Sequence, residues 1–472
     1  MNETPIIETM RLARLKVLLL TVALFAAGSG LAVAAVEAGD GSGVGPSASL
    51  LDNLRDNSQD PLTRLLAQLI VIVAAARLCG ALAMKIRQPA VVGEMVAGIL
   101  LGPSLLGWIS PGIFHWLFPA SSLGVLRLLS QIGVCLFMFV VGMELDVNHL
   151  KQQAKTALWV SQASIVLPYL LGMGAAVFLY NGLAGPNTTF VAFALFVGIS
   201  MSITAFPVLA RILDERGLTK TPLGSTALVC AATNDVTAWS ILAVVVAIAK
   251  AGGVASTLFS IGLVIVFVAV MLFWIKPRLP RWMASAPAGG PGKSLTAGAL
   301  VFLFASALAT DMMGMHALFG SFLAGVVMPA RGELRDFLKL RLENFSSVFL
   351  LPLFFAFTGL RTELGTLNDA SGWLICLGLI VVATIGKLGG AMVTARLNGV
   401  NWIDSLALGS LMNTRGLVEL VALSIGYDLG ILSPRIFTML VAMALVTTGM
   451  TGPLLTFADY LRAKKSLSVK TV

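Results

Sequence analysis

Charged residues are scarce in this chain of 472 residues. They make up 12% of it, against about 25% in a typical soluble domain, while 57% of the residues are hydrophobic. Histidine (three residues) and cysteine (four) are scarce as well. No CxxC pair or Cys/His spacing typical of a metal or redox site occurs. These absences argue against an enzyme and against a resident cofactor, and they direct attention to the hydrophobic runs.

Hydrophobic runs long enough to cross a bilayer, about 20 residues each, recur along the whole chain. After residue 60 there are thirteen, separated by short connections: approximately 65–84, 88–108, 127–144, 157–180, 189–211, 224–250, 256–275, 294–310, 315–330, 343–360, 372–395, 404–424 and 434–457. This pattern predicts an all-α polytopic membrane protein that sits in a lipid bilayer.

The net charge of +9 is distributed unevenly. If the 65–84 run starts outside, the inner connections carry twenty of the 32 Lys and Arg residues and the outer ones only six. This is the positive-inside pattern, so it gives no reason to expect a nucleic-acid partner. It predicts a multi-pass protein of the inner (plasma) membrane with a cytoplasmic C-terminus. The short basic tail, 459–472, is suited to contact anionic lipid headgroups.

The N-terminal segment allows two interpretations. Residues 1–36 have a basic start, an apolar stretch and small residues, which fits either a signal peptide or an extra transmembrane helix. Residues 37–64 are acidic and rich in Gly and Ser, and either interpretation places them outside as a linker.

Thirteen runs divide into a first repeat (65–251), a linker helix with a cytoplasmic loop (252–293) and a second repeat (294–458) of opposite orientation. Inverted repeats are a transporter architecture in which helices are broken near the midplane. Breaks should therefore recur at matching places. The fifth run contains Pro207 with Thr204 close by, and the fifth run of the second half contains Asn413, Thr414 and Gly416. We therefore expect two discontinuous helices that cross.

The stretch AATNDVTAWS, 231–240, contains Asn234 and Asp235 within an apolar run. An Asp at the middle of a membrane helix costs roughly 3 kcal/mol, so it is seldom kept without a task. Beside two crossing helix breaks, a carboxylate can bind either a cation or a proton. The alternative is that Asp235 is the structural partner of a buried base.

Three more ionisable residues lie inside the later runs. Lys387 is too deep to reach either surface easily. It can neutralise the negative ends of broken helices or pair with Asp235. Arg415 and Glu419 have the i,i+4 spacing of a local ion pair, for which we expect a mainly structural role in compensating charge.

Seven motifs in order resemble those of the monovalent cation:proton antiporter-2 family, and most closely its cation/H+ exchanger branch: QPAVVGEMVAGILLGPSLLG (88–107), FMFVVGMELD (137–146), SITAFPVLARIL (202–213), NDVTAW (234–239), HALFGSFLAGVVMP (316–329), PLFFAFTGLRTEL (352–364) and MNTRGLVEL (412–420). The resemblance covers residues 65 to 458. It implies a sodium/proton antiporter-like fold with a dimerisation scaffold and a mobile core, and a homodimer.

By the same resemblance, Asp235 is the residue that binds both the ion and the proton, Asn234 is its neighbour, Thr204 lies near the unwound segment, and Lys387 is the basic residue of the core. Electrogenic members typically carry two adjacent acids, whereas here the first is Asn234, so one-for-one exchange is the simpler expectation. The predicted function is antiport of K+ or Na+ against H+ by alternating access. A cation efflux channel is the alternative, although no backbone-carbonyl filter sequence is present.

Overall fold

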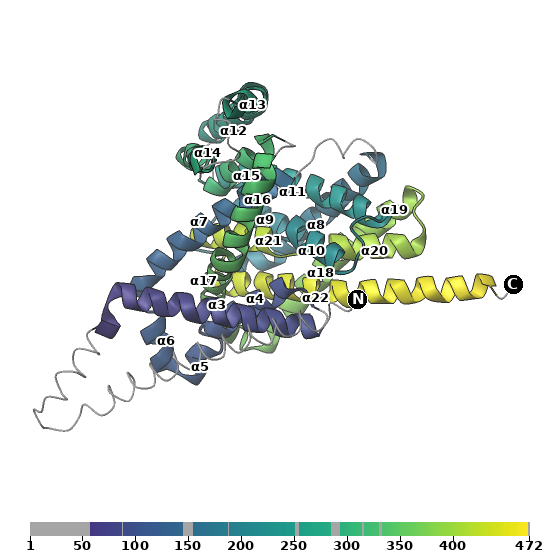
Figure 1. Cartoon of the computed structure of the whole chain (residues 1–472). Helices are drawn as coiled ribbons and strands as arrows, with labels where there is room; N and C mark the ends of the chain where they lie inside the picture. Colours follow the sequence, from purple (N-terminus) through teal and green to yellow (C-terminus); the bar gives the residue numbers. More distant parts are fainter. Residues whose placement is uncertain are drawn as a thin grey trace, which may run out of the picture.

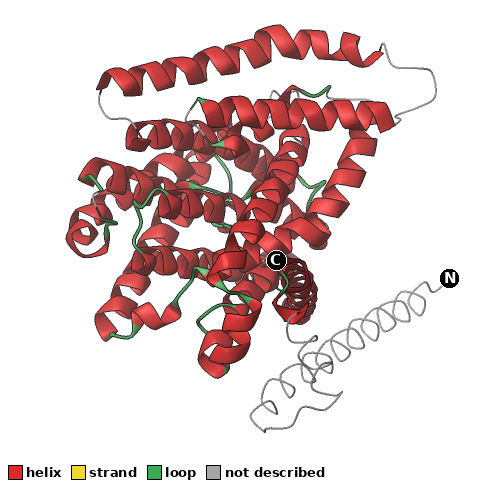
Figure 2. Cartoon of the chain, turned by 90° about the vertical axis from the view of Figure 1, so that its left-hand side faces the viewer, coloured by secondary structure: helices red, strands yellow, loops and turns green. Residues whose placement is uncertain are grey.

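The computed structural model of this chain describes residues 57–86, 88–144, 154–186, 188–250, 254–284, 293–313, 316–329 and 333–470. The predicted N-terminal segment 1–36 and most of the predicted linker 37–64 lie outside these ranges. Within them the chain folds into helices joined by short loops, and no strand is formed (Figure 2).

The helices follow one another in this order: α3 (Pro61–Lys85), α4 (Ala90–Leu101), α5 (Leu106–Ile109), α6 (Pro111–Leu117), α7 (Ala120–Glu144), α8 (Ala154–Leu183), α9 (Phe190–Ser202), α10 (Phe206–Glu215), α11 (Pro222–Lys250), α12 (Val254–Ala269), η3 (Val270–Ile275), α13 (Lys276–Ala284), α14 (Lys293–Met312), α15 (Ala317–Val327), α16 (Glu333–Phe345), η4 (Ser346–Leu350), α17 (Leu351–Leu360), η5 (Leu364–Leu367), α18 (Ala370–Thr384), η6 (Ile385–Gly389), α19 (Gly390–Leu397), α20 (Trp402–Met412), α21 (Leu417–Asp428) and α22 (Pro434–Lys470). The last helix, α22, extends beyond the others towards the C-terminus (Figure 1).

The described residues contain eleven helices that are long and apolar enough to span a membrane. The pair α20–α21, bent by 41°, makes twelve. The remaining predicted span, 315–330, contains α15, which has only 11 residues. At 1.5 Å per residue such a helix is about 16 Å long, roughly half the hydrocarbon thickness. The all-helical membrane fold is confirmed, but the count of thirteen spans is not.

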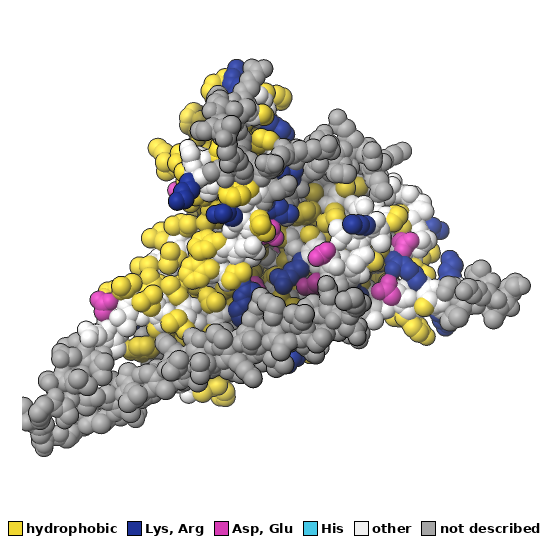
Figure 3. Space-filling model, in the orientation of Figure 1, with side chains coloured by type: hydrophobic (Ala, Val, Ile, Leu, Met, Phe, Trp, Pro, Cys, Tyr) yellow, Lys and Arg dark blue, Asp and Glu magenta, His cyan; other side chains and the backbone are white. Residues whose placement is uncertain are grey.

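Large apolar side chains cover much of the outer surface. Phe178, Phe273 and Met312 are each at least 80% exposed, and hydrophobic side chains dominate a broad part of the face in Figure 3. In water such a surface would cause aggregation, whereas lipid is the solvent it matches. The described helices therefore carry a surface suited to a bilayer.

Two groups of helices can be distinguished by their packing. The scaffold group consists of α3, α4, α7, α15 and α17, which pack on one another. Its helices touch backbone to backbone at glycines: a Cβ on Gly142 of α7 would lie 2.2 Å from the Phe322 oxygen of α15, and one on Gly98 of α4 would lie 2.2 Å from the Phe355 oxygen of α17. The core group consists of α8 to α11 and α18 to α22. The two groups are seen side by side in Figure 1.

Two loops of the core group are joined by backbone hydrogen bonds. Ala184 and Leu432 form an antiparallel bridge, the amide of Gly185 donates to the Ile431 oxygen at 2.9 Å, and Ser433 Oγ donates to the Leu183 oxygen at 2.7 Å. The loop that follows α21 is thereby attached to the loop that follows α8. This end of α21 belongs firmly to the core group.

Candidate ion-binding site

The first predicted break lies between α9 and α10. Helix α9 ends at Ser202, residues 203–205 are not helical, and α10 begins at Phe206. Pro207 is the second residue of α10, a position where a missing N–H costs nothing because the first amides of a helix have no partner in it. The proline therefore starts the second half-helix, and the break itself precedes it.

The second predicted break lies between α20 and α21. Helix α20 ends at Met412 with Asn413 as its C-cap, and α21 begins at Leu417 after Gly416. A Cβ on Gly416 would lie 2.8 Å from a methyl group of Val208 in α10. The glycine thus allows the second break to press closely against the first half of the core.

Hydrogen bonds join the two breaks directly. The Ala205 amide donates to the Thr414 oxygen at 3.1 Å, and Thr204 Oγ1 donates to the Met412 oxygen at 3.0 Å. Both pairs are buried among the core helices. Each break therefore satisfies backbone groups that the other leaves unpaired, as a membrane interior requires. The expectation of two discontinuous helices that meet at their breaks is confirmed.

Asp235 lies on α11 next to this crossing. Its side chain is fully buried, and neither carboxylate oxygen has a hydrogen-bond partner. The backbone N–H of Phe206, the first residue of α10, faces the carboxylate without reaching hydrogen-bond geometry. The N-terminus of a helix carries a partial positive charge, so α10 presents a weak attraction to the ionised acid. That attraction leaves both oxygens open to an ion or a proton.

Asn234, unlike its neighbour Asp235, is hydrogen-bonded to other protein groups. Its Oδ1 accepts a hydrogen bond from the Thr204 amide at 3.0 Å, and its Nδ2 donates to Ser164 Oγ at 3.2 Å. The side chain therefore fixes the first break to α11 and α8. An aspartate here would keep the acceptor but lose the donor, so Asn234 fits a bracing role.

Lys387 binds helix carbonyls. It lies in the π-helical turn η6, is fully buried, and donates to the Ser202 oxygen and to the Ser164 oxygen, the latter at 3.2 Å. Ser202 is the last residue of α9, where the helix dipole is negative. The sequence left two roles open for Lys387; its contacts are those expected for the first, with the ends of broken helices, and the structure contains no ion pair between Lys387 and Asp235.

Arg415 binds the same helix end. Its Nη1 donates to the Ser200 oxygen and its Nη2 to the Met201 oxygen, both at 2.8 Å. Nη1 also lies 3.1 Å from Glu419 Oε1, and both side chains of this ion pair are fully buried. Lys387 and Arg415 together therefore occupy three successive carbonyls at the end of α9. Arg415 thus contacts both the carbonyl end of α9 and the carboxylate of Glu419.

Several oxygen atoms around the crossing remain without a protein partner. They belong to Asp235 (both oxygens), Asn413 (whose amide nitrogen is also unpartnered) and Glu419 (Oε2). A buried polar atom without a partner costs about 1–3 kcal/mol, which favours water or an ion there. Oxygen ligands suit hard cations. In the described part of the chain no three His, Cys, Asp or Glu residues cluster as a transition-metal site would require.

Two residues that hold this site were not predicted from the sequence. Ser164 on α8 accepts a hydrogen bond from the Asn234 side-chain amide at its hydroxyl and one from the Lys387 ammonium at its backbone carbonyl. Thr448 on α22 accepts from the Arg415 amide at 2.8 Å and donates back to the Arg415 oxygen at 2.9 Å. Polar residues in otherwise apolar spans were the available signal, but many serines and threonines in membrane helices bind only their own backbone.

The chain was compared with known proteins. It matches the family described as "Sodium/hydrogen exchanger, transmembrane" over residues 72–458. It is 43% identical to the Na+/H+ antiporter NhaS4 of Synechocystis over 398 residues, which cover 83% of this chain and 96% of that protein. It is 34% identical over 439 residues to the K+/H+ antiporter 1 of Saccharomyces cerevisiae, covering 90% of this chain but only 50% of the yeast protein.

The fold was compared with solved structures. The sodium proton antiporter MjNhaP1 of Methanocaldococcus jannaschii matches with a TM-score of 0.58 at 15% sequence identity, over 85% of this chain and 98% of that one. At this identity the match concerns the fold alone. Taken with the sequence matches, it shows that the chain belongs to the transmembrane sodium/hydrogen exchanger family.

Proposed function

We propose that this protein is a secondary antiporter that exchanges a monovalent cation, K+ or Na+, for H+, and that Asp235 is the carboxylate to which both bind. The family match and the names of the relatives support the reaction. The arrangement of charges around the two breaks supports the assignment of Asp235.

One observation carries the assignment of Asp235. The two buried basic side chains near it, Lys387 and Arg415, are already bound to the carbonyls that end α9. Glu419 is paired with Arg415. Among these four charged side chains only Asp235 has neither an ion pair nor a hydrogen bond to the protein. A buried carboxylate without a partner is stable only if it takes up a proton or a cation, and those are the two substrates of the exchange.

Competition for one carboxylate then gives the exchange. A cation displaces the proton when the site faces one side, and a proton displaces the cation when it faces the other. Movement of the core group against the scaffold group would expose the site alternately. Asn234 and Thr204 hold the first break in place during this movement, and the unpartnered oxygen of Asn413 is a candidate second ligand for the cation.

The membrane setting is part of the proposal. The charge pattern supports a cytoplasmic C-terminus and an inner (plasma) membrane location. A homodimer is expected by resemblance to the family. Light scattering in detergent would test it, because the protein mass of the particle should be twice the chain mass of 49.5 kDa. The repeats 65–251 and 294–458 are proposed to be related by inversion, and the breaks at matching positions support this.

Proteoliposomes with a trapped pH dye would test the function. After a pH gradient is imposed, addition of K+ or Na+ should dissipate it with wild-type protein and should have no effect with Asp235→Asn. Asp369→Asn is a matched control, because it removes an acid that is paired with Arg435 at the helix ends, far along the chain from the breaks. Full exchange by Asp235→Asn would disprove the assignment of this residue.

A further inference from the structure

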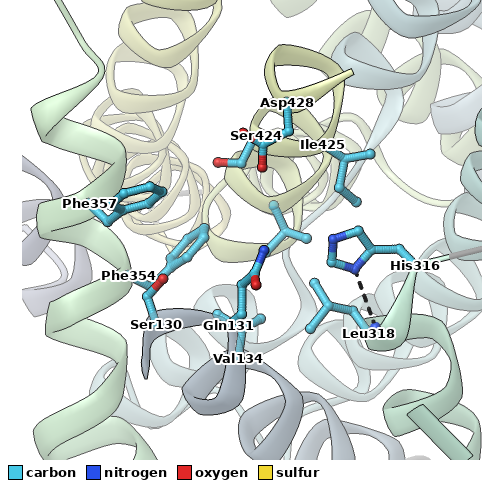
Figure 4. Close-up of a pocket in the computed structure, with 11 residues that line it drawn as sticks. Ser130, Gln131, Val134, His316, Leu318, Phe354, Phe357, Ser424, Ile425 and Asp428 are labelled. Atoms are coloured by element: carbon cyan, nitrogen blue, oxygen red, sulfur yellow. Dashed lines mark hydrogen bonds between the residues drawn. The ribbon is translucent and has the colours of Figure 1, made fainter. Parts of the chain in front are cut away.

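A cavity lies between the two groups of helices. It is lined by Ser130 and Gln131 of α7, His316 and Leu318 at the start of α15, Phe354 and Phe357 of α17, and Ser424, Ile425 and Asp428 of α21. Figure 4 shows Gln131 and His316 pointing into the space below α21. The cavity offers about 30 Å³ to the centre of a water-sized sphere, and about 10–15 Å³ suffices for one water molecule. The space is thus large enough to hold water.

The cavity lies beside the half-helix that leads to the ion site. Helix α21 begins at the second break and ends at Asp428, and Ser424 lies one turn before that end. The hydroxyl of Ser424 is buried and has no hydrogen-bond partner, which is expected of a group that binds water in this space. On α21 the polar lining consists of Asp428 at the outer end and Ser424 one turn nearer the break, and the lining residue nearest the break, Val421, is apolar.

A cluster of ion pairs lies at the outer end of this cavity, where Asp428 lines it. One Asp428 oxygen lies 2.7 Å from Arg361 Nη1 and the other lies 3.1 Å from Arg127 Nη2. Arg361 also stacks on Phe357 at 4.2 Å and on Tyr427 at 5.1 Å from the ring centroids. The arginine is thereby held between aromatic faces, and the carboxylate is bound from two sides. We call Arg127, Asp428 and Arg361 the outer cluster.

The outer cluster joins the two groups of helices. Asp428 ends α21, whose following loop is bound to the core group, whereas Arg127 and Arg361 belong to α7 and to the end of α17 in the scaffold group. All three residues lie on the side that the charge pattern assigns to the exterior. A shift of α21 against the scaffold would pull the carboxylate away from both guanidinium groups.

We propose that the cavity is the external entrance to the ion site and that the outer cluster is the gate that closes it in this conformation. The proposal rests on the proposed antiport function in one respect only: it takes the movement of core against scaffold as the event that opens the gate. The gate itself can be tested without any transport measurement.

The test is access of a membrane-impermeant thiol reagent to the cavity. A cysteine-free variant with Ser424→Cys is reacted from outside, alone and with Asp428→Asn added. Opening of the gate should raise the rate of labelling about three- to tenfold, the size expected for loss of two partly exposed ion pairs. Asp428→Glu keeps the charge and should stay near the starting rate. Asp369→Asn is the matched control, because it breaks an outer ion pair that joins only core helices, α18 and α22.

Each outcome decides the proposal. Faster labelling with Asp428→Asn, but not with Asp369→Asn, supports the gate. An unchanged rate, or an equal rise with Asp369→Asn, overturns it. If Asp428→Asn fails to insert, Arg127→Gln removes one of the two pairs from the exposed side and should give a smaller rise in the same assay. Repeating the labelling in the Asp235→Asn background separates the gate from the proposed antiport. Asp428→Asn should still speed labelling of Ser424→Cys there, even though exchange is absent.

Discussion

At the scale of single residues, the decisive feature is which buried charges have partners. Arg415 and Lys387 each bind carbonyls at the end of α9, and Asp235 is left with none. The type of residue alone could not distinguish these roles, because a lysine in a membrane span serves equally well as the partner of an acid. Its position beside two carbonyl oxygens, those of Ser164 and Ser202, makes the distinction.

The proposed competition between cation and proton at Asp235 predicts how pH acts on transport. Because a protonated carboxylate cannot bind a cation, lowering the pH should raise the apparent KM for the cation, by up to about tenfold per pH unit where the proton dominates. The maximal rate should change less than the KM. Initial rates over a range of cation concentrations at four pH values would measure both. A constant KM with a falling maximal rate would point to protonation elsewhere.

The contacts of Lys387 predict a structural role that is independent of Asp235. Lys387→Met should lower the free energy of unfolding by about 1–3 kcal/mol, since the Ser164 and Ser202 carbonyls lose their donor. A similar loss should occur when Asp235→Asn is already present, because no hydrogen bond or ion pair joins the two side chains and only a charge–charge attraction between them is removed. Thermal unfolding of the two single variants and the double variant would complete the cycle. A larger coupling would reveal an ion pair between Lys387 and Asp235.

At the scale of helices, glycine decides how closely the scaffold packs. A Cβ on Gly98 would lie 2.2 Å from the Phe355 backbone oxygen, which cannot move without displacing α17. Gly98→Ala should therefore lower the free energy of unfolding by about 1–3 kcal/mol. A Cβ on Gly378 of α18 would have no other atom within 4 Å. Gly378→Ala should therefore be neutral or slightly stabilising. Equal unfolding temperatures for the two variants would contradict this account.

The helices also show how far the sequence reaches. Hydropathy located nearly every span, since lipid requires about 20 apolar residues in a row. Polar residues and Pro207 located both breaks, and a lone acid in an apolar run located Asp235. The short α15 was not foreseen, because a helix of 11 residues can lie within a longer apolar run. The partners of Lys387 were not foreseen either, because backbone carbonyls at a helix end leave no mark in the sequence.

At the scale of the whole molecule, the charges of the core determine what an exchange cycle moves across the membrane. Lys387 and Arg415 equal Glu419 and ionised Asp235 in charge, so these four buried side chains sum to zero before a substrate binds. Binding of either a proton or a monovalent cation adds one positive charge. Both loaded states then carry the same charge, and Asn234 contributes no second acid because its side chain is an amide, which does not ionise.

Electroneutral one-for-one exchange is therefore expected. If one net charge moved per cycle, a potential of 100 mV would shift the balance point by about 2.3 kcal/mol, which is roughly a 50-fold change in the cation ratio that opposes a given pH gradient. With exchange of Na+ for H+ in proteoliposomes, that ratio should instead stay constant when the potential is set by a K+ gradient and an ionophore. A balance point that moves with the potential would show that a second proton crosses, and a further titrating group in the core would then have to be found.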